Sequence, residues 1–318
     1  MSPSSRSPRR RRVAFAGAIL FVLLTSSCGD ASRTSTAARK TAGTTTSTAI
    51  ARSTTTNQPA LAGDAITKVG TASLHIRCVG DGAATVVLIP GFGDALSKMS
   101  GLETALAPSA RVCSYDRYGN GTSDAPPEPQ TFSIQAENLH QLLVLSNVPG
   151  PYLLVAHSLG GPEAVTFASA YRDEVIGMLL LDGTPANWGD ATCGIKADGT
   201  TGTQSMVDFC AAMRDPLKNQ EHLDSAAAYS AVSRVRSLGD LPLVADTAIN
   251  DDYVVRYGLG PADVATLKAE WLKGQNHWVS LSTNSRLQSV KSSHDIYLEH
   301  PDLVVRQIQQ LLVGSTAE

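Results

Sequence analysis

Ser158 is the residue best suited to nucleophilic chemistry, because it follows an apolar run and precedes a helical segment. The stretch from Leu153 to Gly161 reads LLVAHSLGG. A serine hydroxyl is an effective nucleophile only when it is exposed beside a base and beside donors for the developing oxyanion. A tight strand-to-helix turn provides that setting and requires small residues two positions to either side. Ala156 and Gly160 meet the requirement, so the segment predicts a nucleophile turn of the form A-x-S-x-G.

The elements around this serine follow an α/β pattern from residue 61 onward. Six short runs rich in β-branched residues and leucine, without polar alternation, predict strands covered on both faces. They are Thr85–Ile89, Arg111–Tyr115, Tyr152–Ala156, Val175–Leu181, Leu241–Ala245 and Arg286–Val290. Apolar residues at helical spacing predict helices over Ile134–Leu145 and Leu303–Leu312. Such alternation implies a mostly parallel sheet, with its chemistry at the carboxyl ends of the strands.

Together with the serine turn, three further segments resemble the α/β-hydrolase family. Residues 85–93 (TVVLIPGFG) resemble the early strand and turn of that family, with Pro90 where histidine is common. Residues 115–124 (YDRYGNGTSD) resemble its D-R-x-G-x-G-x-S segment, and residues 292–301 (SSHDIYLEHP) resemble the segment with the catalytic histidine. The resemblance covers about residues 70–313. It implies the α/β-hydrolase fold, a mostly parallel central sheet with helices on both faces and a cap insertion.

The resemblance also implies roles for individual residues. Ser158 would be the nucleophile and His294 the general base. The oxyanion donors would be the backbone N–H groups of Leu159, directly after the nucleophile, and Phe92, in the turn after the early strand. Asp116, in the second segment, is expected to anchor loop structure rather than to react.

The acid that orients the histidine has two candidates, because two aspartates follow apolar runs after the nucleophile. Asp182 ends the run IGMLLLD, a position that some family members use, and Gly183 beside it leaves space for an imidazole. Asp251 follows the next run, at the more common family position, but Asp246 is expected to interrupt that run. We favour Asp182 and keep Asp251 as the alternative.

Residues 185–237 interrupt the alternation of strands and helices, and the resemblance identifies them as the cap over the nucleophile. This insertion contains five large apolar residues that could line an acyl pocket but that more often form the cap's own core, namely Trp188, Ile195, Met206, Phe209 and Met213. The resemblance also identifies the segment around Trp271 and Trp278 as a helix that packs near the carboxyl-terminal histidine.

Four cysteines follow residue 28, an even number that suits an exported domain. The resemblance assigns Cys78 and Cys113 to neighbouring strands, so a bridge can join them. Cys193 and Cys210 enclose sixteen residues, and cross-linking a loop of that size stabilises the fold by about 3 kcal/mol. The alternative is that these are two pairs of reduced, buried thiols.

The first 28 residues have the order typical of an export signal. Five arginines lie within the first twelve residues, an apolar stretch follows from Val13 to Leu24, and Cys28 comes after three small residues. The stretch is shorter than the ~20 residues of a membrane span, as in a secretory signal peptide. Because Cys28 resembles the lipidated residue of a bacterial lipobox, we expect a lipid anchor, with a plain signal peptide as the alternative. Residues 29–60, rich in Ser, Thr and Ala, are expected to form a linker to a domain over residues 61–318.

Composition excludes several other functions. The 318 residues are 42% hydrophobic and 17% charged, with 26 Lys and Arg against 29 Asp and Glu. Removal of residues 1–27 takes away five of the arginines and no acidic residue, which leaves 21 basic side chains and a formal charge of −8. An acidic domain gives no reason to expect a nucleic acid partner. Without zinc-ligand spacing, a phosphate-binding loop or a dinucleotide fingerprint, we expect no metal and no cofactor.

These features predict an exported, lipid-anchored serine hydrolase that cleaves carboxylic esters or thioesters of a small-molecule or acyl substrate through an acyl-enzyme. It would lie in the cell envelope, on the outer face of the cytoplasmic membrane, or be secreted. The alternatives are an amidase or iminopeptidase on the same fold and a non-catalytic envelope lipoprotein. Dehalogenase chemistry is disfavoured, because it needs a carboxylate where Ser158 stands.

Overall fold

A computed structural model describes residues 59–188, 193, 204–250 and 261–314. The chain divides into two units, Met1–Thr55 and Thr56–Glu318, and every described residue belongs to the second. The predicted export signal with Cys28 and nearly all of the predicted linker therefore lie outside the described residues, as does Asp251. Within the described part of the chain, no helix is both long enough and apolar enough to cross a membrane.

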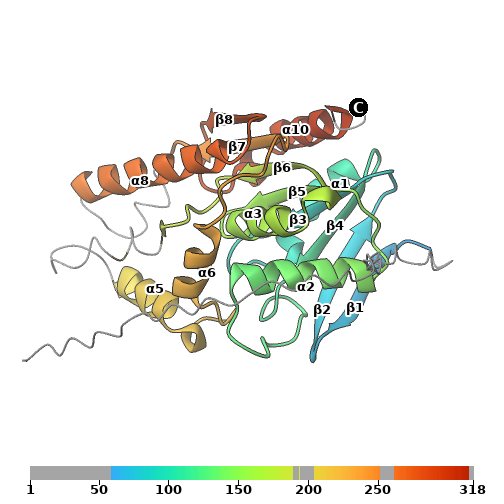
Figure 1. The fold of residues 1–318 in the computed structure, drawn as a ribbon, viewed down its shortest axis with the longest axis horizontal. Helices are drawn as coiled ribbons and strands as arrows, with labels where there is room; N and C mark the ends of the chain where they lie inside the picture. Colours follow the sequence, from blue (N-terminus) through green and yellow to red (C-terminus); the bar gives the residue numbers. More distant parts are fainter. Residues whose placement is uncertain (1–58, 189–192, 194–203, 251–260, 315–318) are drawn as a thin grey trace, which may run out of the picture. The chain divides into compact units, whose positions relative to one another are not determined.

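The second unit is built on an eight-stranded sheet with the strand order β1-β2-β4-β3-β5-β6-β7-β8 (Figure 1). The strands are β1 (Gly63–Val69), β2 (Ala72–Val79), β3 (Thr85–Ile89), β4 (Arg111–Asp116), β5 (Tyr152–His157), β6 (Val175–Leu181), β7 (Leu243–Ala248) and β8 (Ser285–Val290). Only β2 runs antiparallel to its neighbours, and every other pair is parallel. The prediction of a mostly parallel sheet is thus confirmed.

Two hydrophobic cores lie on the two faces of the sheet, which explains why the central strands show no polar alternation. On β3, Val87 and Ile89 belong to one core, whereas Val86 and Leu88 belong to the other. The first core is covered by α2 (Phe132–Leu145), α3 (Gly160–Ala170), α6 (Ser225–Val232) and α8 (Pro261–Ser280). The second is covered by α1 (Ser100–Leu106), α9 (Ile296–Glu299) and α10 (Pro301–Gly314). Short helical turns form at Leu96–Met99, Arg172–Glu174 and Pro216–Lys218.

Strand β7 differs from its prediction, because it begins two residues later and runs through Asp246. The side chain of Asp246 is fully buried, and Gln307 of α10 donates a hydrogen bond to its Oδ1 at 2.9 Å. Burial raises the pKa of this carboxyl to about 6, because the buried site disfavours the charged form. The strand continues through Asp246 because Gln307 provides a hydrogen-bond donor to the buried carboxyl, so the expected interruption is wrong.

The cap insertion contains α5 (Gln204–Arg214) and α6 among its described residues. Cys193 and Cys210 form a disulfide within this insertion, with their Cα atoms 5.7 Å apart. Cys78 of β2 and Cys113 of β4 stand opposite each other in the ladder and form a second disulfide, with a Cα separation of 4.1 Å.

Candidate active site

Ser158 lies in the turn between β5 and α3, in a left-handed backbone conformation with φ of 52°. The turn is tight enough that a Cβ atom on Gly160 would lie 2.6 Å from the carbonyl oxygen of Ile89. The carbonyl of Ser158 accepts hydrogen bonds from the amides of Gly161 at 2.9 Å and Thr184 at 2.8 Å. These contacts hold the strained backbone and leave the Ser158 hydroxyl at the carboxyl end of the sheet.

His294 and Asp182 meet Ser158 in one hydrogen-bonded row. The Nε2 atom of His294 lies 2.8 Å from the Ser158 Oγ, and its Nδ1 lies 2.7 Å from the Asp182 Oδ2. The three residues follow β5, β6 and β8, whose carboxyl ends lie at the same edge of the sheet. With Nδ1–H donating to the carboxylate, the lone pair of Nε2 faces the serine hydroxyl.

The second oxygen of Asp182 is held by three donors, two of them from the end of β7. The indole Nε1 of Trp271 donates to Oδ1 at 2.7 Å, the Ala248 amide at 3.1 Å and the Thr247 hydroxyl at 3.3 Å. The carboxylate is 1% exposed and its backbone is also left-handed, with φ of 48°. The α8 ring of Trp271 lies 5.7 Å from the His294 ring, close to the histidine as the sequence predicts. Both oxygens of Asp182 are therefore fixed.

A cavity of about 400 Å³ contains Ser158 and His294. Phe92 and Leu159 both line it, and among the described residues neither of their backbone amides has a hydrogen-bond partner. The cap contributes an apolar wall made of Trp188, Phe209, Met213 and Tyr229. Asp94, Lys98 and Asp295 bring charge to the cavity lining. The cavity thus combines a nucleophile, free amide donors and an apolar surface.

His157 packs behind this row, although it is adjacent to Ser158 in the sequence. It is 2% exposed, its Nε2 lies 3.1 Å from the carbonyl oxygen of His294, and the two rings are 4.7 Å apart. Burial lowers the pKa of His157 well below its usual value, so the ring is neutral and Nε2–H is the donor. The contact fixes the loop that carries His294.

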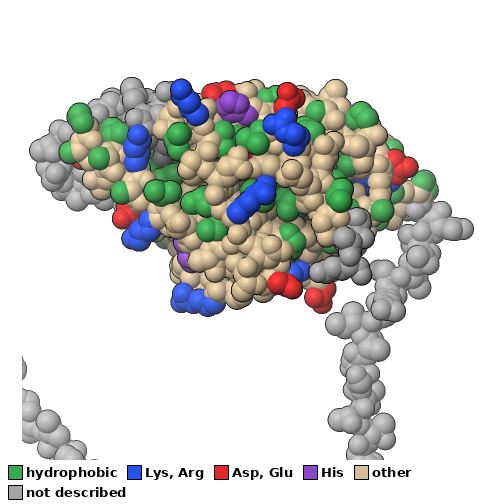
Figure 2. All heavy atoms as spheres, turned by 90° about the horizontal axis from the view of Figure 1, so that it is seen from above, with side chains coloured by type: hydrophobic (Ala, Val, Ile, Leu, Met, Phe, Trp, Pro, Cys, Tyr) green, Lys and Arg blue, Asp and Glu red, His purple; other side chains and the backbone are tan. Residues whose placement is uncertain are grey.

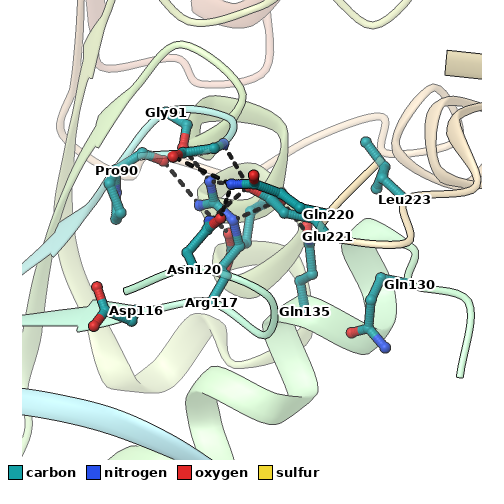
Figure 3. Close-up of polar contacts among 12 residues, drawn as sticks. Pro90, Gly91, Asp116, Arg117, Asn120, Gln130, Gln135, Gln220, Glu221 and Leu223 are labelled. Atoms are coloured by element: carbon teal, nitrogen blue, oxygen red, sulfur yellow. Dashed lines mark hydrogen bonds and ion pairs between the residues drawn. The ribbon is translucent and has the colours of Figure 1, made fainter. Parts of the chain in front are cut away.

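A buried charged cluster that the sequence analysis did not identify lies next to Pro90 and Gly91, in the turn that leads into Phe92 (Figure 3). Its centre is the guanidinium of Arg117, which is 2% exposed and pairs with Glu221 of the cap and Glu163 of α3. The only sequence signal is the single charge of Glu163 within the apolar α3 segment, because Glu221 lies among polar residues. Asp116 is held separately by the amides of Leu96 and Thr122, as expected of a loop anchor.

Known sequences resemble this chain over a stretch that includes Ser158 and Asp182. Residues 84–292 match a family model described as alpha/beta hydrolase fold. The uncharacterized protein YqjL of Bacillus subtilis is 25% identical over 232 residues, which cover 71% of this chain and 82% of that protein. An uncharacterized protein of Schizosaccharomyces pombe is 40% identical over 77 residues, 24% of this chain, and the chain spans only 14% of that protein's length. The putative carbamate hydrolase RutD of Cronobacter turicensis is 32% identical over 103 residues, 32% of this chain and 38% of that protein.

Solved structures share the fold at low sequence identity. A thermophilic esterase from Thermogutta terrifontis superposes with a TM-score of 0.54 at 19% identity, covering 80% of this chain and 99% of that chain. The carboxylesterase CesB (YbfK) from Bacillus subtilis gives a TM-score of 0.56 at 13% identity, covering 80% and 93%. The fold predicted from the sequence is confirmed.

Proposed function

The chain belongs to the α/β hydrolase family, and on that premise we propose that it is a serine hydrolase that cleaves carboxylic esters or thioesters. The observation that carries the proposal is the row from Ser158 through His294 to Asp182, with separations of 2.8 and 2.7 Å. These distances lie within the range required of a nucleophile, its base and the group that orients the base.

The proposed reaction has two steps. The Ser158 Oγ attacks the acyl carbon while its proton passes to Nε2 of His294, and the alcohol or thiol leaves with that proton. Water then attacks the acyl-enzyme, His294 takes the proton of the water, and the acid departs as the proton returns to Ser158. Asp182 stabilises the imidazolium that forms in each step. The Phe92 and Leu159 amides stabilise the oxyanion, and the apolar cap wall binds the acyl chain.

We also propose that the enzyme is exported and held at the membrane through Cys28. The arginine-rich start, the short apolar stretch and the Ser/Thr-rich linker support this location. The two disulfides are a second, independent support, because such bonds persist in oxidising compartments outside the cytoplasm. On the face seen in Figure 2, Lys and Arg side chains lie scattered among acidic and apolar ones, so this face carries no basic patch of the kind that binds a polyanion.

Covalent labelling tests the proposed function. Protein lacking residues 1–28 is treated with a fluorophosphonate probe and with p-nitrophenyl esters of short and long acids, beside Ser158→Ala. We expect labelling and hydrolysis by the unmodified protein, and neither by the variant. Absence of Ser158-dependent labelling and hydrolysis would overturn the proposed function and favour the non-catalytic alternative.

Cleavage of C–N bonds is a second candidate, supported by the 32% identity over 103 residues to a protein named as a putative carbamate hydrolase. An amidase must protonate an amine leaving group, which His294 could also do. A p-nitrophenyl ester and a p-nitroanilide of the same acid, assayed beside a carbamate, distinguish the two candidates. A higher kcat/KM on the anilide or carbamate than on the ester would favour the second candidate.

A further inference from the structure

Glu221, a carboxylate of the cap, lies against the backbone turn that carries Phe92 (Figure 3). Its side chain is fully buried. The Oε1 atom accepts hydrogen bonds from the Gly93 amide at 2.7 Å and from the Asn120 side chain at 2.8 Å, while Oε2 accepts from Arg117 Nε at 3.0 Å. The cap residue thus binds both the turn and the arginine beneath it.

Arg117 holds the same turn from the other side. Its Nη1 donates to the carbonyl of Pro90 at 2.8 Å, and its Nη2 donates to the carbonyl of Gly91. The Gly91 carbonyl and the Phe92 amide belong to one peptide group, which is planar and trans. Because the carbonyl and the N–H point in opposite directions, the bond from Arg117 also sets the direction of the Phe92 N–H.

Glu221 is needed to keep this arginine in place. Burial lowers the pKa of Arg117, but the nearby carboxylates of Glu221 and Glu163 more than offset that effect, and the pKa is raised overall. A buried guanidinium without such partners carries a large desolvation cost. Glu221 alone of the two carboxylates also contacts the turn directly, through the Gly93 amide.

We propose that Glu221 is a positioning residue for catalysis, which holds the Phe92 amide in the direction that the oxyanion requires. The inference rests on the proposed hydrolase function. Since Glu221 belongs to the cap and lies 128 residues from Gly93 in the sequence, the oxyanion site is complete only when the cap is docked on the turn. A residue of the cap then contributes to the stabilisation of the transition state.

Two Glu→Gln substitutions, which leave the side-chain size unchanged, distinguish a positioning role for Glu221 from the general effect of losing a buried charge. In Glu221→Gln, one side-chain atom becomes an NH₂ group that must face either the Gly93 N–H or the Arg117 Nε–H, and both are donors only. In the control Glu163→Gln, the NH₂ group can face Tyr115, whose hydroxyl donates to Glu163 but can turn and accept. Each variant removes one buried charge from Arg117, but only the first disturbs the turn.

The measurements are kcat and KM on a p-nitrophenyl ester, and the inhibition constant of a trifluoromethyl ketone, whose serine adduct places an oxyanion in the same site. For Glu221→Gln we expect kcat to fall about 10- to 100-fold, somewhat less than the 10²–10³ for removal of a donor. KM should change by less than about threefold, and the inhibitor should weaken in parallel with kcat/KM. Glu163→Gln should lose no more than about threefold in kcat.

Equal losses in the two variants, or a rise in KM without a fall in kcat, would overturn the inference. If Glu221→Gln does not fold, Glu221→Asp decides the question, because it keeps the charge for Arg117 but is too short to reach the Gly93 amide as well. It should show the same loss of kcat, and full activity would overturn the inference. Absence of Ser158-dependent labelling in the unmodified protein would instead overturn the proposed function itself.

Discussion

Both carboxylate oxygens of Asp182 have hydrogen-bond partners, so its replacement gives a sharp test at the scale of one side chain. In Asp182→Asn the Oδ2 position can become an NH₂ group, which cannot accept the proton on Nδ1 of His294. The imidazole would then present the wrong tautomer to Ser158. We expect kcat to fall by about 10⁴-fold with the fold intact, as in other triads of this kind.

Thermal unfolding and fluorophosphonate labelling rates complete that test. Asp251→Asn, which changes the alternative acid, is the matched control and should retain activity within a few-fold. The reverse pattern, with Asp251→Asn inactive and Asp182→Asn active, would identify Asp251 as the acid.

The sequence allows a functional residue to be predicted when it directly follows an apolar run. It does not when the residue's partners are distant along the chain. Ser158, His294 and Asp182 each follow a recognisable run, so their meeting at one edge of a parallel sheet could be expected. Glu221 has no such signal, because its partners Gly93 and Arg117 lie 128 and 104 residues away. Nothing local distinguishes a buried carboxylate of that kind from a solvated one.

Strand β7 contains the buried Asp246, and this carboxyl predicts how the stability of the fold depends on pH. The pKa of this carboxyl is raised to about 6 from an ordinary value of 3.8. Below about pH 3 both the folded and the unfolded chain hold the proton, so the group has no effect on stability. As the pH rises towards 6 the unfolded chain releases its proton first, and stability falls. Above pH 7 the cost reaches about 3 kcal/mol.

Asp246→Asn removes this pH dependence while its amide oxygen can still accept the bond from Gln307. We expect the free energy of unfolding of the variant, relative to the unmodified protein, to rise by about 2–3 kcal/mol between pH 4 and pH 8. Urea unfolding at several pH values measures it. Parallel stability curves for the two proteins would contradict the raised pKa.

The antiparallel strands β1 and β2 show why some elements escape prediction. Side chains on β1 alternate between exposed and partly buried positions up to Val69, and the run carries Asp64 and Lys68. A search for continuous apolar runs finds the strands buried on both faces and passes over such an edge hairpin. The signal that could have found the hairpin is the period-two alternation in residues 72–79, where Leu74, Ile76 and Cys78 are buried and alternate with polar side chains.

The disulfide between Cys78 and Cys113 links the hairpin to the parallel part of the sheet and bears on the stability of the whole unit. It closes a sequence separation of 35 residues, and a loop of that size stabilises the folded state by about 3–4 kcal/mol. Replacement of both cysteines by alanine should therefore lower Tm by about 10 °C. Calorimetry with and without reductant measures the change, and an unaltered Tm in the double variant would count against a structural role for the bridge.

For the whole unit, alternation of element types was sufficient to predict a parallel sheet with helices on both faces. The cap could be located, as the stretch over residues 185–237 that breaks the alternation, but its internal arrangement could not be predicted. Individual side chains of the cap, such as Phe209 and Met213, line the cavity, and no periodic pattern encodes where the cap helices dock.

Both Ser158 and Asp182 have left-handed backbones, a conformation that costs a residue other than glycine about 1–3 kcal/mol. Glycine would relieve that cost at either position, so selection for stability and selection for catalysis oppose each other there. A descendant that no longer needed hydrolytic activity would gain stability from glycine at either position. Glycine at these two positions in a related sequence would therefore mark a lineage that has abandoned hydrolysis while keeping the architecture.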